Sequence, residues 1–426
     1  MPELSDAPRT PSGGVTEPRH YAFLLLVTFL NILNFVDRQL LASFANFIVP
    51  ELGLSNTQFG LLTGVLFIVF YSGMGLFAGA LADRVHRPRL VAAGLALWSA
   101  LTAASGAARG FVSLGIPRAF IGVGESVLTP AAMSMLADRF PRERLGFIAG
   151  TYYMGVPLGV GVSLLIAGYL GPAIGWRNCF YLLGALGLVM AVVMLFVTEM
   201  PRRGALSQEV PETSRQGIVG PLRDALRSQP ALSLTIAGGV ATHLVLGAAA
   251  FDQLWFVHER GFERAEIARL SGWIGVVGGV LGNLLGGLGA DWWQRRMDSA
   301  RPVFLGVVLL VMVPINIAFR LVPPDSFWFL LGLFAGYMQL GVLYGPTFAT
   351  VQELSPPAIR ATVIAFFILA LNVVGLGIGI TAGGFMIDAM ASQGVEEPYT
   401  WTLLSFSILS GLSIPCFFAA GRKLSR

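Results

Sequence analysis

Long runs of apolar residues, separated by short polar breaks, recur along the whole chain. Each run holds about 20 residues, and a helix of that length rises about 30 Å, which is the thickness of the hydrocarbon core of a bilayer. The pattern therefore predicts membrane-spanning helices. Twelve spans are expected, at residues 21–46, 57–81, 90–108, 112–137, 146–170, 176–198, 231–256, 267–290, 302–321, 327–351, 361–387 and 399–420.

The composition agrees with this pattern. Of the 426 residues, 12% are charged and 55% are hydrophobic, whereas about a quarter of the residues in a soluble domain are charged. The mean hydropathy of +0.71 applies to the whole length rather than to one terminal segment. We therefore expect an all-α integral membrane protein that has lipid as its solvent along most of the chain.

Two polar segments divide the chain. The first 20 residues are polar and rich in proline and lack the apolar core of a cleavable signal, so the first span is expected to serve as the targeting signal. The longest internal polar segment separates six spans from six. We expect an N-terminal tail at 1–20, a six-helix bundle at 21–198, a linker at 199–230, a second six-helix bundle at 231–420 and a tail at 421–426.

The basic residues predict which ends of the spans face the cytoplasm. The two tails and the polar breaks on their side hold 20 Lys and Arg residues, whereas the breaks on the opposite side hold six. Because Lys and Arg near span ends stay on the cytoplasmic side, both termini are expected in the cytoplasm. This topology accounts for the net charge of +4, and no nucleic-acid partner is expected.

The two halves carry related segments. GALAD, which ends at Asp83, reappears as GLGAD, which ends at Asp291, an offset of 208 residues. PRER, which ends at Arg144, reappears as PAIR, which ends at Arg360, an offset of 216. Each pair follows the same span of its half. Two six-helix pseudo-symmetric halves are typical of transporters whose substrate site lies between the halves near mid-membrane.

The break after the second span resembles a known signature. GALADRVHRPR is similar to the cytoplasmic signature of the major facilitator superfamily, Gly-x-x-x-Asp-Arg followed by basic residues. The first-span segment NFVDRQLL and the fourth-span segment RAFIGVGESVLTPAAMSMLADRFPRERLG resemble the Spinster branch of lysolipid transporters, in a bacterial member. The second half departs from the signature, because Trp292 follows Asp291 where an Arg would stand.

This resemblance implies the major facilitator fold and a proton-coupled secondary transporter in the plasma (inner) membrane of a bacterium. The implied substrate is an amphiphilic anionic lipid, a lysophospholipid or a molecule like sphingosine-1-phosphate, which a monomer moves by alternating access. An organic-anion symporter and a multidrug exporter of the same superfamily stay open as alternatives. The symporter branch also has an Asp-Arg pair in its first span and an acidic residue after a Gly in its fourth.

Four charged residues lie inside the first and fourth spans, where an ionisable side chain is costly and is expected to face a partner or a cavity. Asp37 and Arg38 are adjacent, whereas Arg118 and Glu125 lie seven residues apart on one helix face. Burial and a neighbouring Arg act in opposite directions on a carboxylate, so small changes in water access would switch its protonation. We therefore predict that Glu125 carries the coupling proton with Asp37 as its partner, and the Spinster resemblance implies the same roles.

The basic residues of the same spans are candidates for substrate binding. Arg118 is expected to hold an anionic headgroup by its planar fork when Glu125 is neutral. Arg38 points about 100° away from Asp37 on a helix and is expected to bind substrate, to snorkel or to cap another polar group. His243, near mid-depth in the seventh span, is a further candidate, with a hydrogen-bonded interior histidine as the alternative. A static ion cluster is the alternative for the four charges.

The signature after the second span predicts a conformational latch. Gly79 lets two helices approach closely, and Asp83, at a helix end, can accept hydrogen bonds from the N-terminal amides of a neighbouring helix. A contact made in only one conformation biases the equilibrium between outward-open and inward-open states. Simple anchoring at the cytoplasmic surface is the alternative for the basic residues. The other latch candidates are Arg84, Arg87, Arg144, Asp291 and Arg360.

Other chemistry has little support in the sequence. Cys179 and Cys416 lie far apart in apolar runs without a CxxC or Cys/His spacing, so no disulfide, metal or cofactor is expected. The chain has no GxxxxGK[ST], HExxH or GxSxG motif, which argues against an ATP-driven pump and against an enzyme. A non-transporting sensor with a transporter fold stays open. The expected partners are the substrate, protons and membrane lipid.

Overall fold

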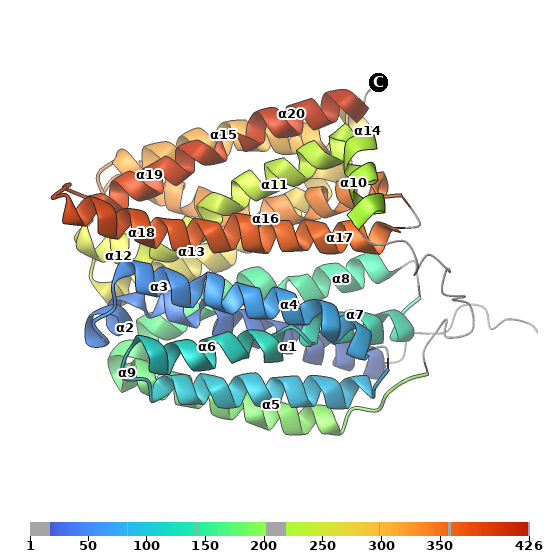
Figure 1. The fold of residues 1–426 in the computed structure, drawn as a ribbon, viewed down its shortest axis with the longest axis horizontal. Helices are drawn as coiled ribbons and strands as arrows, with labels where there is room; N and C mark the ends of the chain where they lie inside the picture. The colour runs from blue at the N-terminus through green and yellow to red at the C-terminus, as the bar shows by residue number, and fades with distance from the viewer. Residues whose placement is uncertain are drawn as a thin grey trace, which may run out of the picture.

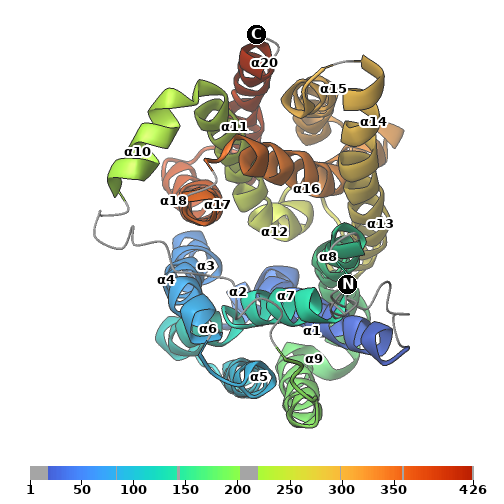
Figure 2. The same cartoon turned by 90° about the vertical axis from the view of Figure 1, so that its right-hand side faces the viewer.

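The computed structural model describes residues 18–82, 84–141, 144–201, 219–297, 299–356 and 359–424, and the regular elements in these ranges are all helical. Figure 1 shows the helices running along the long axis in two groups, α1 to α9 in blue to green and α10 to α20 in lime to red. α1 begins and α20 ends at the same end of the molecule, here called the terminal end (Figure 2), and the opposite end is called the distal end.

The first group contains the predicted spans one to six. Several spans consist of two helices joined by a short irregularity. The helices are α1 (Pro18–Ser43), α2 (Ala45–Glu51), α3 (Asn56–Thr63), α4 (Val65–Ala82), α5 (Arg87–Gly106), α6 (Phe111–Glu125), α7 (Leu128–Arg139), α8 (Leu145–Tyr153) and α9 (Gly155–Leu195).

The fifth and sixth spans follow each other without a loop. Eleven helical runs among the described residues are long and apolar enough to cross a membrane, and one of them, Leu145–Leu195, has 51 residues. A helix of that length would measure about 76 Å, more than twice the hydrocarbon thickness. Gly175, with φ 80° and ψ 155°, breaks it. Only glycine adopts that conformation readily. The single run is therefore two spans, which confirms the expected twelve.

The second group contains spans seven to twelve. Two of its elements, η4 and η6, are short π-helical stretches inside spans eight and eleven. The elements are α10 (Val219–Ser228), α11 (Pro230–Ala248), η3 (Ala249–Phe251), α12 (Asp252–His258), α13 (Arg264–Leu284), η4 (Leu285–Gly289), α14 (Ala290–Met297), α15 (Arg301–Leu321), α16 (Phe327–Leu354), α17 (Arg360–Leu369), η6 (Ala370–Gly377), α18 (Ile378–Ser392), α19 (Pro398–Ser410) and α20 (Ser413–Leu424).

One helix lies in the segment that the hydropathy pattern predicts as a polar linker. α10 places Leu222, Ala225 and Leu226 on one face, where Ala225 is buried and both leucines contact a cluster that includes Leu232 and Val351. The i, i+3, i+4 spacing is the signature of an amphipathic helix. A search for long apolar runs misses it because the helix has only 10 residues.

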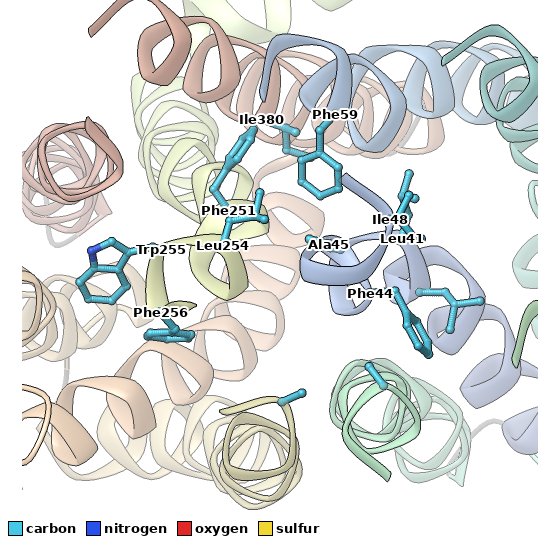
Figure 3. Close-up of a cluster of buried hydrophobic side chains, with 14 of the residues drawn as sticks. Leu41, Phe44, Ala45, Ile48, Phe59, Phe251, Leu254, Trp255, Phe256 and Ile380 are labelled. Carbon is cyan, nitrogen blue, oxygen red and sulfur yellow. The ribbon is translucent and has the colours of Figure 1, made fainter. Parts of the chain in front are cut away.

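At the distal end the two groups share one hydrophobic core. Figure 3 shows Ala45 and Phe59 of the first group facing Phe251, Leu254 and Ile380 of the second. The Phe59 and Phe251 rings meet edge to face with 5.4 Å between their centroids. Burial of these rings stabilises the contact between the halves at this end.

A second contact between the halves joins α9 to α13. Glycines allow it, because a Cβ on Gly161 would lie 2.9 Å from the Gly272 carbonyl oxygen, and a Cβ on Gly272 would lie 3.0 Å from the Gly161 oxygen. The two backbones therefore touch directly.

Candidate functional site

The fourth span places Glu125 in the interior of the first half. α6 ends at Glu125, and α7 begins three residues later. A Cβ on Gly122 would lie 2.8 Å from the Phe67 carbonyl oxygen, and one on Gly124 would lie 2.8 Å from the Gly94 oxygen. Because glycines let α4 and α5 approach so closely, the carboxylate beside them is buried, and Glu125 is 2% exposed.

Glu125 forms an ion pair with Arg38 of α1. Its Oε2 accepts hydrogen bonds from Arg38 Nε at 3.2 Å and Nη2 at 3.1 Å. The Glu125 side chain has no exposed surface, whereas that of Arg38 is 19% exposed. The guanidinium also lies over the rings of Tyr71 at 4.2 Å and Phe35 at 4.8 Å. Arg38 thus joins a buried acid to a partly accessible aromatic surface.

Arg118 has a different environment from the one expected. Its Nη2 donates to the Arg38 carbonyl oxygen at 2.7 Å, its guanidinium lies 4.6 Å from the Phe67 ring centroid, and the residue is 4% exposed. The direct partner of Glu125 is therefore Arg38. Two turns of one helix separate Arg118 from Glu125 by about 10.5 Å, while Arg38 reaches Glu125 from the facing helix.

Asp37 points to another side of α1. Its Oδ2 accepts a hydrogen bond from Thr102 Oγ1 of α5 at 2.5 Å. The same hydroxyl lies 3.0 Å from the Trp98 carbonyl oxygen. A hydroxyl has a single proton, so it can donate fully to only one of these acceptors. The protonation state of Asp37 therefore decides which of these two oxygens the Thr102 hydroxyl donates to.

His243 faces Tyr344 in the second half. The His243 ring lies with Nδ1 2.9 Å from the Gly239 carbonyl oxygen and Nε2 3.3 Å from Tyr344 Oη. A carbonyl can only accept, so Nδ1 carries a proton and the Nε2 of the neutral ring accepts from the tyrosine. His243 and Tyr344 thus form a hydrogen-bonded pair within the second half.

Gly79 and Asp83 were predicted to form a latch. A Cβ added to Gly79 would meet no atom of the described residues within 4 Å, so these residues do not make the close helix contact expected there. The space around Gly79 is open because of the way the halves are arranged. Their described contacts lie mainly toward the distal end and not beside the end of α4. Asp83 lies outside the described residues.

The other latch candidates mostly bind within their own half. The buried Arg87 donates to Asp138 at 2.5 Å and to Glu199 at 2.8 Å, Arg144 donates to Tyr21 at 2.9 Å, and Arg301 donates to Asp291 at 3.1 Å. These contacts tie helix ends together inside each half. The two remaining latch candidates are Arg84, which is exposed, and Arg360, which is half-buried.

Sequence reasoning missed a repeated ion pair at the terminal end. Arg301 forms an ion pair with Glu353, as Arg87 does with Asp138 in the first half. The signal was the Arg-Pro pair at the start of the third span of each half, Arg87-Pro88 and Arg301-Pro302.

A second ion pair was also missed. Asp252 Oδ1 lies 2.7 Å from Arg320 Nη1 in the second half. Asp252 follows Asp37 by 215 residues, close to the repeat offset, which could have revealed it. Among the described residues, no group of three His, Cys, Asp or Glu side chains is arranged to hold a metal ion.

Comparison with known proteins agrees with this arrangement. The family model of the Major Facilitator Superfamily matches residues 27–380. The chain is 28% identical over 415 residues to an MFS-type efflux pump of Mycolicibacterium smegmatis, across 96% of this chain and 94% of that protein. It is 28% identical over 198 residues to the probable sphingolipid transporter spinster homolog 1 of Arabidopsis thaliana, across 42% of this chain and 40% of that protein.

A solved structure shows the same fold. The crystal structure of a bacterial homolog of the human lysosomal transporter Spinster, in an inward-facing and unoccupied conformation, matches with a TM-score of 0.82 and 24% identity. The match covers 96% of this chain and 98% of that chain. The chain therefore belongs to the Major Facilitator Superfamily.

Proposed function

We propose that the protein is a proton-coupled secondary transporter that moves an amphiphilic anionic lipid, such as a lysophospholipid or a molecule like sphingosine-1-phosphate, by alternating access. The ion pair of Arg38 and Glu125 carries this proposal, because its acid is fully buried while its guanidinium stays 19% exposed. A proton and an anion can open such a pair together. The similarity to a probable sphingolipid transporter of Arabidopsis thaliana supports a lipid substrate.

Coupling in this proposal passes through Arg38. A proton that binds Glu125 removes the negative charge and leaves the guanidinium as an unpaired cation in a partly desolvated place, which is unfavourable. A phosphate or carboxylate headgroup then restores the balance by accepting hydrogen bonds from the same planar fork. When Glu125 loses its proton, it competes again for Arg38 and the anion is released.

Asp37 and Arg118 support this exchange. Asp37 is the second proton acceptor, and Thr102 can donate either to its carboxylate or to the Trp98 carbonyl. Arg118 adds a second positive charge behind Arg38, but it is buried and bonded to the backbone of α1. We therefore assign the direct headgroup contact to Arg38 and an electrostatic role to Arg118.

Tyr344 and His243 form the proposed contact on the second half. When Nε2 of neutral His243 accepts the phenolic proton, the Tyr344 oxygen is left to accept from a donor on the substrate, such as a hydroxyl or an ammonium group. Lysolipid headgroups combine such donors with an anion. The two halves would then hold opposite ends of one headgroup.

The proposal includes the orientation of the protein in the membrane. The excess of basic residues, 20 against six, supports a terminal end that faces the cytoplasm, in the inner membrane of a bacterium. In that orientation the shared core at the distal end would close the external side, so we propose an inward-facing state, and we propose that the transporter works as a monomer.

A small organic anion or a drug is the alternative substrate. The efflux pump of Mycolicibacterium smegmatis matches 96% of this chain, which favours an exporter. The small organic anion would use Arg38 and Glu125 in the same way but would gain no affinity from a long alkyl tail.

The test is binding to the purified protein by lysophospholipids that share one headgroup and differ in tail length, at an acidic and a neutral pH. Each CH₂ that becomes buried should strengthen binding by about 0.8 kcal/mol. Arg38→Ala should remove most binding, Arg38→Lys should keep part of it, and Arg89→Ala, at an exposed arginine, serves as the control.

Two results would reject the proposal. An affinity that stays flat or falls as the tail lengthens would reject the lipid and favour a small anion. Wild-type binding by a folded Arg38→Ala variant would reject the headgroup site.

A further inference from the structure

An acidic side chain of the second half caps a helix of the first half. Asp388 of α18 accepts hydrogen bonds from the backbone amides of the first two residues of α3, Asn56 at 3.1 Å and Thr57 at 2.7 Å. The side chains of the same two residues donate to it as well, Asn56 Nδ2 at 2.9 Å and Thr57 Oγ1 at 2.6 Å. Four donors thus converge on one carboxylate.

The cap satisfies groups that α3 cannot satisfy itself. The first amides of any α-helix have no acceptor within the helix. Ser55 and Gln58 form a capping box, in which Ser55 Oγ accepts from the Gln58 amide at 3.1 Å. This local cap leaves the amides of Asn56 and Thr57 to Asp388. A carboxylate at a helix N-terminus also interacts favourably with the helix dipole.

The contact exists only while the two halves touch. A Cβ on Gly384, one turn before Asp388, would lie 2.2 Å from the Asn56 carbonyl oxygen, and one on Gly60 would lie 2.9 Å from the Ile380 oxygen. α3 and α18 therefore meet backbone to backbone. Tyr399 of α19 adds a hydrogen bond from its hydroxyl to Asn56 Oδ1 at 2.7 Å. Separation of the halves would expose all these groups to solvent.

We propose that Asp388 is a clamp that holds the distal end closed, and that its release accompanies the opening of this end. The proposal rests on the alternating access proposed above, but not on the identity of the substrate or on coupling to protons. The clamp acts on the second and eleventh spans, the same two spans whose other ends would meet through the latch predicted at Asp83. Contacts at opposite ends of one helix pair favour opposite states.

The experiment measures the distance across the distal end of the full chain. Spin labels are placed at Ala107 of the first half and Gln393 of the second, both exposed, after Cys179 and Cys416 are replaced by alanine. Asp388→Asn removes the negative charge and places an NH₂ group beside amide donors. The population with an open distal end should rise by roughly 2- to 30-fold, the range expected for a charge at a helix N-terminus.

Two further variants test the geometry. Thr57→Val removes one of the four donors and should shift the population in the same direction by a smaller factor. Glu396→Gln makes the same charge change at an exposed position of the distal loop and should leave the distances unchanged. Gel filtration and the melting temperature show whether each variant is folded.

The measurement needs no substrate and no proton gradient, so it separates the clamp from the proposed function. A folded Asp388→Asn variant with wild-type distances would overturn the clamp even if lipid transport were demonstrated. A shift in Asp388→Asn and a smaller one in Thr57→Val would support it even if the substrate were a small anion. An equal shift in Glu396→Gln would contradict it, because general surface charge would then explain the result.

Discussion

Arg38 donates both of its hydrogen bonds to a single oxygen of Glu125, Oε2, at 3.2 and 3.1 Å. The other oxygen, Oε1, has no hydrogen-bond donor in bonding geometry among the described residues. Asn34 approaches the carboxylate, but its Nδ2 makes no such bond either. Oε1 is therefore the atom that can bind a proton without displacing a hydrogen bond from Arg38.

Glu125→Gln should abolish proton-driven transport. The glutamine keeps the shape of a protonated glutamate but cannot exchange a proton, so uptake into proteoliposomes should lose its dependence on a pH gradient, while substrate binding persists. Glu396→Gln is the control, at an exposed acid far along the chain. A pH-dependent rate equal to that of the wild type would remove Glu125 from the coupling step.

Arg38→Ala should destabilise the protein more than the double variant Arg38→Ala/Glu125→Gln. Loss of one partner leaves a buried charge uncompensated, which costs about 3–5 kcal/mol as an upper limit. When both charges are removed, no unpaired charge is left in the interior and this cost does not arise. Melting temperatures in detergent for the four members of this cycle measure the coupling. Strictly additive effects would show that the two side chains do not interact energetically.

Glu199→Gln should destabilise the terminal end of the first half in a pH-dependent way. Partial burial opposes ionisation, but hydrogen bonds from the Arg87 side chain and amide outweigh it and hold the pKa of Glu199 below its usual range. A carboxyl with a lowered folded-state pKa contributes stability above its unfolded pKa of about 4.3 and loses it as the pH falls through the folded value.

The free energy of unfolding of the wild type should thus exceed that of Glu199→Gln by about 1 kcal/mol at neutral pH. This difference should disappear once the pH lies well below about 4. Thermal unfolding in detergent at several pH values checks this. A difference that grows as the pH falls would contradict the assignment.

Gly384→Ala and Gly79→Ala should have opposite effects. The added methyl at Gly384 would meet the Asn56 carbonyl oxygen at 2.2 Å, whereas at Gly79 it would meet nothing within 4 Å. Overpacking typically costs about 1–3 kcal/mol, while alanine in place of an unhindered helical glycine gains up to about 1 kcal/mol. Melting temperatures and distal-end distances compare the two variants. Equal tolerance of both would show that α3 and α18 are not in firm contact.

The spans could be predicted from the sequence because lipid acts on each helix separately. A run of apolar residues such as 302–321 crosses the membrane whatever its neighbours are, and the structure has α15 at Arg301–Leu321. The fifth and sixth spans were separable for the same reason, although only one glycine, Gly175, lies at their turn. The hydropathy of a segment indicates whether lipid or water surrounds it, and the positions of the spans depend on little else.

The partners inside the site could not be predicted in the same way. Which arginine meets Glu125 depends on how α1 and α6 are rotated and shifted relative to each other, and the spacing of residues within one helix holds no information about that. Arg118 was favoured because it shares a helix with Glu125, yet Arg38 of the facing helix makes the contact. Asp388 lies one residue beyond the predicted eleventh span, and its partners are more than 330 positions away.

The turn at Gly175 joins the fifth and sixth spans directly, so we expect these two spans to move together. No loop lies there to absorb a displacement, so the part of α9 before Gly175, which touches α13 through Gly161, must move together with the part after it, which lies against α5 through Gly184 and Gly187. At the α13 side the backbones meet at Gly161 and Gly272, and the side chains of Val276 and Leu165 lie against these glycines. A displacement of the second half at this contact is therefore passed through the turn at Gly175 to the part of α9 that lies against α5.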